Sequence, residues 1–226
     1  MVGTGGALRR YGAYAGLRKA AFGVLASLAA AMMAPGAAGA EVRIVALGDS
    51  LTHGYGLAPE DGFVPRLEAW LRENGAPDAV VANAGVSGDT TAGGLARFDW
   101  SVGEGADAVI VELGGNDLLR AIDPATSRAN LEGILVKAGE RDMEVLLTGM
   151  RAPVNYGPDY KAAFDAMYPE LAEAHGALYD PFFLEGLVGR PELFQPDGIH
   201  PNAEGVEALV ARFGPVVLDL IARVRD

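Results

Sequence analysis

The sequence contains no cysteine among its 226 residues. This absence excludes disulfide bonds, catalysis by a thiol, and attachment of a lipid to an amino-terminal cysteine. Histidine is also scarce, and its three positions are His53, His175 and His200. Any imidazole that takes part in catalysis must therefore be one of these three.

Basic residues are few as well, with 18 lysines and arginines against 30 aspartates and glutamates. Four basic residues and no acidic ones lie in the first 40 positions, so the remaining 186 residues hold 14 basic and 30 acidic side chains, a formal charge of −16. A surface of this charge disfavours the phosphates of nucleic acid and anionic lipid head groups. We therefore expect no nucleic acid partner.

The first 40 residues have the order of a secretory signal peptide. Basic residues are followed by an apolar run over 20–34 and by small residues that end in Ala38-Gly39-Ala40. The apolar run is shorter than the roughly 20 residues needed to span a bilayer, which disfavours a membrane anchor. We expect cleavage after Ala40 and export to the periplasm or the medium, with no stable membrane insertion afterwards. The pair Arg9-Arg10 leaves the twin-arginine route open, although its sequence context is poor.

Residues 41–226 are expected to form a single domain in which short apolar runs alternate with amphipathic ones. The runs predict strands at 43–47, 79–82, 108–113, 144–148 and 177–179. The clearest helical pattern covers 206–224, where Pro215 is expected to kink or split the helix. This alternation predicts an α/β fold with a doubly wound, flavodoxin-like parallel sheet of about five strands in three layers. A (β/α)₈ barrel is disfavoured because it needs eight such units.

The functional groups of such a sheet lie just beyond the carboxyl ends of its strands. Ser50 follows the first strand in Gly48-Asp49-Ser50-Leu51, where a serine can be a nucleophile or only a helix cap. Glycines follow the second strand at Gly85 and Gly88, where backbone N–H groups can approach a ligand closely. Asn116 follows the third strand after two glycines, either as a turn former or as an amide donor to an oxyanion.

A fourth segment, Asp197-Gly198-Ile199-His200-Pro201, precedes the last helix. The spacing lets the Asp197 carboxylate meet one ring nitrogen of His200 while the other points toward Ser50. A serine hydroxyl needs such an oriented imidazole as its base. The four segments together predict a serine hydrolase.

Two other functions fit parts of the pattern. A metal-dependent phosphoesterase could use Asp49, Asp117, Asp197 and His200, although a two-metal site normally shows more ligands than this sequence offers. A binding module without catalysis could use the same fold. The presence of Ser50, Asn116, Asp197 and His200 together speaks against a mere binder.

The four segments resemble the sequence blocks of the SGNH, or GDSL-type, hydrolase family over residues 43–225. The stretches Val111–Arg120 and Ala152–Gly157 resemble its bacterial group of thioesterases, lysophospholipases and arylesterases. This resemblance implies hydrolysis of acyl-CoA thioesters, aryl esters or lysophospholipids, usually in the periplasm, with no metal and no cofactor.

The resemblance also implies roles for individual residues. Ser50 would be the nucleophile, His200 its general base and Asp197 the residue that orients His200. The oxyanion hole would comprise the N–H of Ser50, the N–H of Gly85 and the side chain of Asn116. Substrate contacts are expected from His53, which stands where a small residue is usual, and from Leu118 and Leu119 on a loop over the acyl chain.

Overall fold

The structure of the protein, a computed structural model, describes residues 1–3 and 40–226. The expected signal peptide therefore lies almost entirely outside the described residues. Residues 40–226 form one compact unit. None of the helices within the described residues combines the length and the apolar character that a bilayer crossing requires.

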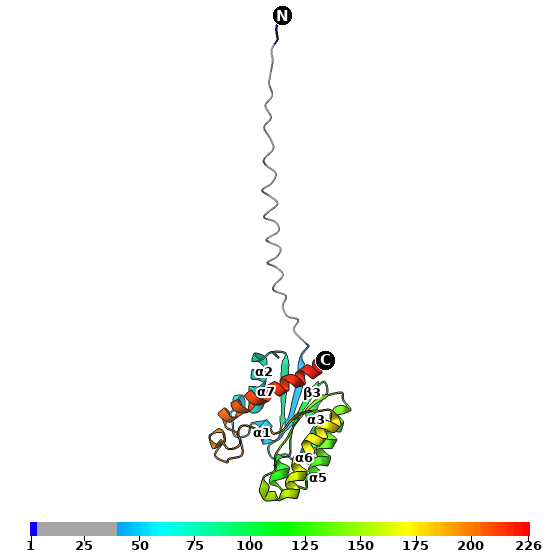
Figure 1. The fold of residues 1–226 in the computed structure, drawn as a ribbon, viewed down its shortest axis with the longest axis vertical. Helices are drawn as coiled ribbons and strands as arrows, with labels where there is room; N and C mark the ends of the chain where they lie inside the picture. Colours follow the sequence, from blue (N-terminus) through cyan, green and yellow to red (C-terminus); the bar gives the residue numbers. More distant parts are fainter. Residues whose placement is uncertain (4–39) are drawn as a thin grey trace. The chain divides into compact units, whose positions relative to one another are not determined.

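Five parallel strands form one sheet, which is seen with its flanking helices in Figure 1. The order of the strands is β2-β1-β3-β4-β5. Their bounds are β1 Val42–Gly48, β2 Ala79–Gly85, β3 Ala108–Glu112, β4 Glu144–Thr148 and β5 Leu178–Asp180. Every residue of the central strand β3 is buried, because helices cover both faces of the sheet. The predicted doubly wound sheet of five strands is confirmed.

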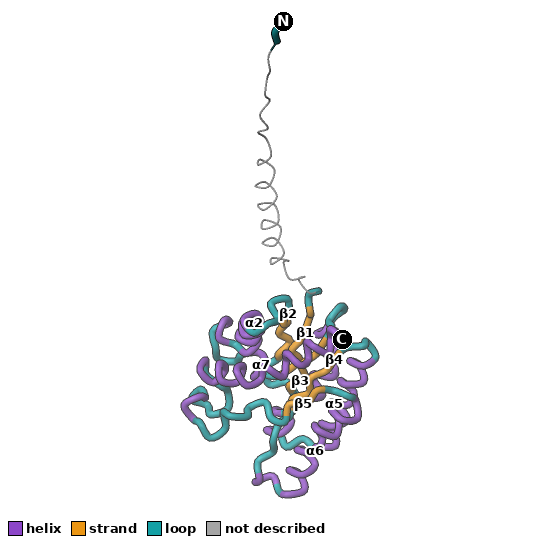
Figure 2. The backbone as a smooth tube through the Cα atoms, turned by 45° about the horizontal axis from the view of Figure 1, so that its top comes forward, coloured by secondary structure: helices purple, strands orange, loops and turns teal. Residues whose placement is uncertain are grey.

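The longer helices lie in two layers, with the strands between them (Figure 2). α2 (Phe63–Glu73) packs with α7 (Ala203–Arg225), while α5 (Pro124–Gly139) contacts both α3 (Thr91–Val102) and α6 (Pro158–His175). The short elements are α1 Ser50–His53, α4 Gly115–Leu119 and the 3₁₀ turns η1 Pro59–Asp61, η2 Val154–Tyr156 and η3 Pro191–Leu193. Most short elements follow the strands and form the edge of the sheet where the site is expected.

Pro215 does not split the last helix, since α7 runs without interruption from Ala203 to Arg225. Its buried face continues on both sides of the proline, with Phe213 before it and Val217 after it. Phe213 forms an edge-to-face cluster with Phe63 and Phe183 at ring separations of 5.1 to 5.7 Å. Burial of an apolar stripe along the helix outweighs the one backbone hydrogen bond that proline cannot make.

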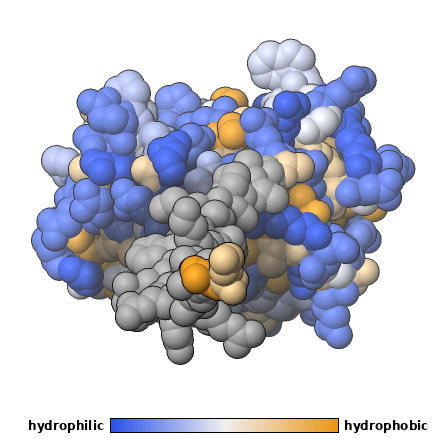
Figure 3. Space-filling model, turned by 90° about the horizontal axis from the view of Figure 1, so that it is seen from above, coloured by the Kyte–Doolittle hydropathy of each residue, from blue (hydrophilic) through white to orange (hydrophobic). Residues whose placement is uncertain are grey.

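The outer surface carries the excess of acidic residues. On the face seen in Figure 3, most side chains of the domain are hydrophilic and the hydrophobic ones are scattered. Such a distribution is usual for a domain whose apolar residues are used in the core.

We predict that Gly214→Ala destabilises the domain, although alanine is the better helix former by about 1 kcal/mol. A Cβ at position 214 would overlap the Trp70 indole, so the packing of α7 on α2 must shift. The expected loss is about 1–3 kcal/mol in the free energy of unfolding, measured by urea denaturation.

The matched control is Gly139→Ala at the end of α5, where a Cβ meets no atom within 4 Å. This variant is expected to be neutral or slightly stabilising. Equal stability of the two variants would contradict the packing explanation.

Candidate active site

The loop after β1 presents Ser50 at the start of a helix. Asp49 caps α1, because its Oδ1 accepts the N–H of Leu51 at 2.9 Å. Ser50 is the first residue of the helix and lies in the wall of a pocket. Gly48 is required before this turn, since a Cβ there would overlap the Thr52 hydroxyl. The local fold thus exposes the serine at the edge of the sheet.

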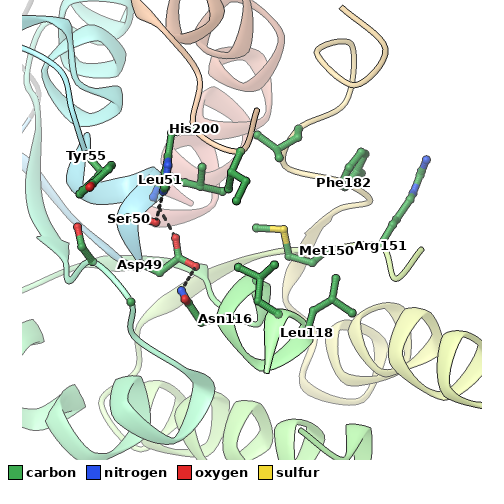
Figure 4. A pocket seen from close by; sticks show the side chains of 16 residues that line it. Asp49, Ser50, Leu51, Tyr55, Asn116, Leu118, Met150, Arg151, Phe182 and His200 are labelled. Atoms are coloured by element: carbon green, nitrogen blue, oxygen red, sulfur yellow. Dashed lines mark hydrogen bonds between the residues drawn. The ribbon is translucent and has the colours of Figure 1, made fainter. Parts of the chain in front are cut away.

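Ser50, His200 and Asp197 form a hydrogen-bonded chain. Nε2 of His200 lies 2.9 Å from Oγ of Ser50, although 150 positions separate the two residues (Figure 4). Nδ1 of His200 lies 2.7 Å from Oδ2 of Asp197. The predicted contact between the first and the last segment of the domain is therefore present. A base oriented by a carboxylate is what a serine nucleophile requires.

Asp197 also organises the segment that carries the histidine. Its Oδ1 accepts the N–H groups of Ile199 at 2.9 Å and of His200 at 3.0 Å. The hydrogen bonds from the His200 ring, the His200 N–H and the Ile199 N–H lower the pKa of Asp197 to about 2. The carboxylate is therefore ionised at any pH at which the imidazole can act as a base.

The imidazole is further held by two residues that the sequence did not single out. The Tyr55 ring lies against the His200 ring, with 4.6 Å between centroids (Figure 4). Gln195 donates its Nε2–H to the Tyr55 carbonyl at 2.8 Å and to the Pro201 carbonyl at 3.0 Å. Its backbone N–H donates to the His200 carbonyl at 2.8 Å. Gln195 thus ties the loop after α1 to the loop that carries His200.

Three possible donors to an oxyanion belong to residues of one pocket wall. The backbone N–H groups of Ser50 and Gly88 make no hydrogen bond within residues 40–226. Asn116, the second residue of α4, lies in the same wall. Its Nδ2 donates one hydrogen to Oδ2 of Asp49 at 3.0 Å, which leaves the second amide hydrogen available (Figure 4).

The structure contradicts the prediction that Gly85 supplies a donor. Its N–H donates to Oδ1 of Asn83 at 2.9 Å, and Gly85 does not line the pocket. A Cβ at Gly85 would overlap the backbone of His53, so this glycine serves close packing between β2 and α1. Gly88 takes its place in the pocket wall, with a positive φ of 81°. Both glycines are visible in the sequence, but the turn that separates their roles is not.

A second carboxyl group lies buried behind Asp49. Oε2 of Glu112 accepts the Thr52 hydroxyl at 2.7 Å and the Asp49 N–H at 3.3 Å, while its Oε1 has no hydrogen-bond partner within residues 40–226. Burial raises the pKa of Glu112 well above its ordinary value, and the neighbouring Asp49 carboxylate raises it further. Burial also raises the pKa of Asp49. Two adjacent buried carboxyl groups favour a proton on one of them.

Asp117, weighed above as a metal ligand, faces the protein interior. Its Oδ1 accepts the hydroxyls of Thr91 and Ser127 at 2.5 and 2.8 Å, and its Oδ2 accepts the Thr91 N–H at 2.8 Å. The side chain is fully buried. Asp117 therefore joins α4 to the first turn of α3 and to α5, and it is not positioned to share a ligand with Asp197 and His200.

The pocket beside Ser50 has a volume of about 350 Å³. Its apolar wall contains Leu51, Leu118, Leu119, Met150, Phe182, Leu184 and Ile199, and Arg151 lies at the end away from Ser50 (Figure 4). Leu118 and Leu119, for which substrate contacts were predicted, both belong to this wall. His53 is not part of this wall, whereas Ser87 is. Nδ1 of His53 lies 3.4 Å from Oγ of Ser87.

Comparison with known proteins was made by sequence and by fold. Residues 46–208 match the GDSL-like lipase/acylhydrolase family. Esterase TesA of Pseudomonas aeruginosa is 40% identical over 179 residues, covering 79% of this chain and 89% of the relative. Thioesterase 1/protease 1/lysophospholipase L1 of Escherichia coli K12 is 38% identical over 169 residues, covering 74% and 79%.

Solved structures agree with these relatives. The esterase AlinE4, described as a member of the SGNH-hydrolase family, is 48% identical and superposes with a TM-score of 0.67, covering 79% of this chain and 96% of AlinE4. The crystal structure of TesA gives a TM-score of 0.74 at 39% identity, covering 79% and 99%. Esterase EstA of Pseudoalteromonas, solved as inhibited by monoethylphosphonate, gives 0.71 at 31% identity, covering 80% and 97%.

We predict that Glu112→Gln makes the domain relatively more stable as the pH rises. The folded-state pKa of Glu112 is raised above its unfolded value of about 4.3, so its contribution to stability is complete below that value and is lost as the pH rises through the folded pKa. Glutamine does not titrate, and its amide oxygen can accept both hydrogen bonds of Oε2. The difference in melting temperature between the variant and the wild type should therefore increase from pH 5 to pH 9.

Glu132→Gln, at an exposed position of α5, is the control for loss of one negative charge. Its melting temperature should follow that of the wild type across the same range. If the curve for Glu112→Gln also runs parallel to the wild type, Glu112 does not titrate as described.

Proposed function

Because the chain belongs to the GDSL-like lipase/acylhydrolase family and is a serine hydrolase of esters or thioesters, we propose an acyl-enzyme mechanism. In this mechanism Ser50 carries the acyl group. The observation that carries the proposal is the 2.9 Å contact between the Ser50 hydroxyl and the His200 imidazole. The Asp197 carboxylate, in contact with the opposite ring nitrogen of His200, completes a Ser50-His200-Asp197 triad. No other serine of the pocket wall is in contact with an imidazole in this way within residues 40–226, since Ser87 meets His53 only at 3.4 Å.

The first half of the reaction transfers the acyl group to the enzyme. Oγ of Ser50 attacks the acyl carbon while Nε2 of His200 takes the hydroxyl proton, which leaves an oxyanion on the tetrahedral intermediate. His200 then gives the proton to the leaving alcohol or thiol, and the bond to that group breaks. Asp197 stabilises the imidazolium that exists between these two steps.

The second half releases the acid. Water enters the place of the leaving group, and His200 removes its proton as the water oxygen attacks the ester carbon. Collapse of the second tetrahedral intermediate returns the proton to Oγ of Ser50 and frees the carboxylic acid. Both intermediates place negative charge on the same oxygen.

For that oxygen we assign three donors: the N–H of Ser50, the N–H of Gly88 and the Nδ2–H of Asn116. Preorganised donors of this kind stabilise the charge that develops in the transition state. Asp49 supports the assignment, because its carboxylate holds one amide hydrogen of Asn116 and so fixes the direction of the other. Gly88 replaces Gly85 for the reasons of geometry given above.

The substrate is proposed to be a small acyl ester or thioester whose acyl chain occupies the apolar wall. Leucine, methionine and phenylalanine side chains offer no partner to a charged or strongly polar acyl group. The relatives are named esterase, arylesterase and thioesterase/lysophospholipase, in agreement with this wall. His53 is proposed to act on the leaving-group side only through Ser87.

Export is proposed from the amino-terminal sequence, with removal of residues 1–40 as a signal peptide. Expression of the full chain in a Gram-negative host should give a periplasmic or secreted form that begins at Glu41, as determined by amino-terminal sequencing. Ala38→Arg, which breaks the small-residue rule at the cleavage site, should leave the longer form uncleaved. A cytoplasmic protein that retains residues 1–40 would contradict the proposal.

Activity is tested with p-nitrophenyl acyl esters and acyl-CoA thioesters. Ser50→Ala should reduce kcat by about 10⁴- to 10⁶-fold, because the nucleophile is lost. Asn116→Ala should reduce kcat by about 10²- to 10³-fold with little change in KM, because its amide acts on the oxyanion of the transition state.

Asn74→Ala provides the matched control, since Asn74 caps the far end of α2 through the Trp70 carbonyl. It should leave kcat unchanged. Near-normal turnover by Ser50→Ala would refute the acyl-enzyme, and near-normal turnover by Asn116→Ala would remove only Asn116 from the oxyanion hole.

A further inference from the structure

One guanidinium group lies behind the two loops that carry the backbone donors. Arg97 projects from α3 and is largely buried, with 16% of its side chain exposed. It donates to the Gly48 carbonyl at 2.9 Å, to the Ala84 carbonyl at 2.8 Å and to Oδ2 of Asp89 at 2.6 Å. A further hydrogen bond reaches the Ser101 hydroxyl in the next turn of the same helix, at 3.0 Å.

The first two acceptors mark the ends of neighbouring strands. Gly48 is the last residue of β1 and stands two positions before Ser50, while Ala84 stands one position before the end of β2. The pairing between these strands ends at Gly48 and Gly85, so no strand ladder holds the two loops beyond that point. One backbone hydrogen bond, from Val86 to the Gly48 carbonyl at 3.0 Å, continues the connection.

The third acceptor fixes the turn that contains Gly88. The Asp89 N–H donates to the Val86 carbonyl at 3.0 Å and closes a four-residue turn. Gly88 is the third residue of that turn, and its φ of 81° matches the value of a type II turn. Asp89 therefore follows directly after the donor, and its carboxylate is anchored by Arg97.

The surroundings are shaped to accept this ion pair. A Cβ at Gly93, in the first turn of α3, would overlap Oδ1 of Asp89. Both charged groups are largely shielded, with 16% of the Arg97 side chain and 12% of the Asp89 side chain exposed. The guanidinium uses Nε for the carboxylate and its two terminal nitrogens for the carbonyls, so its planar fork holds three acceptors in fixed directions, unlike a single surface ion pair.

We propose that Arg97 is a positioning residue for the oxyanion hole. By binding the end of β1, the end of β2 and Asp89 at once, it sets the separation between the N–H of Ser50 and the N–H of Gly88. The inference rests on the proposed function, because it is the oxyanion of the acyl-transfer transition state that needs the two N–H groups at a fixed separation. Loss of this arrangement lowers kcat and leaves KM nearly unchanged, since the ground-state carbonyl is bound less tightly by these donors.

Arg97→Lys tests the inference, because an ammonium group cannot reach three acceptors in different directions. We expect kcat for p-nitrophenyl butyrate to fall about 10- to 100-fold, with KM within about threefold of the wild type. The affinity for an alkyl boronic acid, which forms a tetrahedral adduct with the serine, should fall by the same factor as kcat. In Arg97→Ala, added guanidinium ion at low millimolar concentration should restore part of kcat.

Arg212→Lys is the matched control, since Arg212 is also partly buried and bridges the Asp180 carboxylate and the Phe183 carbonyl. It should keep kcat within about twofold of the wild type, even though its melting temperature falls. If Arg97→Lys does not fold, Asp89→Asn weakens the same contact from the other side and should lower kcat about tenfold, again with KM little changed.

The inference is overturned if Arg97→Lys or Asp89→Asn keeps wild-type kcat and boronic acid affinity. It is also overturned if the loss appears in KM alone, or if it equals the fraction of unfolded enzyme at the assay temperature. Ser50→Ala separates this result from the proposed function. An inactive Ser50→Ala with an unaffected Arg97→Lys refutes only the role of Arg97, whereas an active Ser50→Ala refutes the acyl-enzyme.

Discussion

The register of the parallel ladder is the constraint on which the site depends. Gly48 at the end of β1 pairs with Gly85 of β2 on one side and with Glu112 of β3 on the other. Three loops therefore begin at the same level and in the same direction, and they carry Ser50, Gly88 and Asn116. Parallel strands connected by helices produce this common starting level by themselves, and the hydrogen bonds between the loops are added to it. The fold places the groups within reach, and the side-chain contacts then fix their directions.

Buried polar groups supply those directions. Asp49 orients the amide of Asn116, Glu112 accepts the Asp49 N–H, and Asp117 fastens α4 to the start of α3. Placing such groups in the interior costs free energy unless they are hydrogen-bonded. Oε1 of Glu112 has no hydrogen-bond partner in the part of the chain that the structure describes, which is the kind of local cost that active-site surroundings often carry. The neutral form of one carboxyl in the pair reduces that cost.

Much of the fold could be predicted from the sequence, because strands and helices are set by local patterns of apolar residues. The strand predicted at 144–148 is observed with the same bounds, and the other four differ by three residues or fewer at either end. A split at Pro215 was one expected outcome and is not observed, because the sequence pattern of a helix does not show how much packing compensates for a missing hydrogen bond. The signal peptide stays a prediction.

The site could be predicted only where the residue type itself carries the chemistry. Ser50, Asn116, Asp197 and His200 are such residues, and the structure brings them together. Gly85 and Gly88 have identical side chains, so only the turn conformation tells which N–H faces the pocket. Arg97 and Gln195 look like ordinary surface residues in the sequence, since their roles arise from backbone carbonyls that are distant along the chain.

The hydrogen bonds of Asp197 within its own segment have a consequence for how the enzyme would lose activity on heating. Because this carboxylate binds the ring and the backbone of His200 within four consecutive residues, acid and base form a self-contained unit that can move without coming apart. Its alignment with the serine depends instead on contacts between the two loops, namely the Gln195 hydrogen bond to the Tyr55 carbonyl and the Tyr55 ring against His200. Moderate heating would then move Asp197 and His200 together out of line with Ser50 before the sheet unfolds. An enzyme inactivated in this way should regain its activity on cooling.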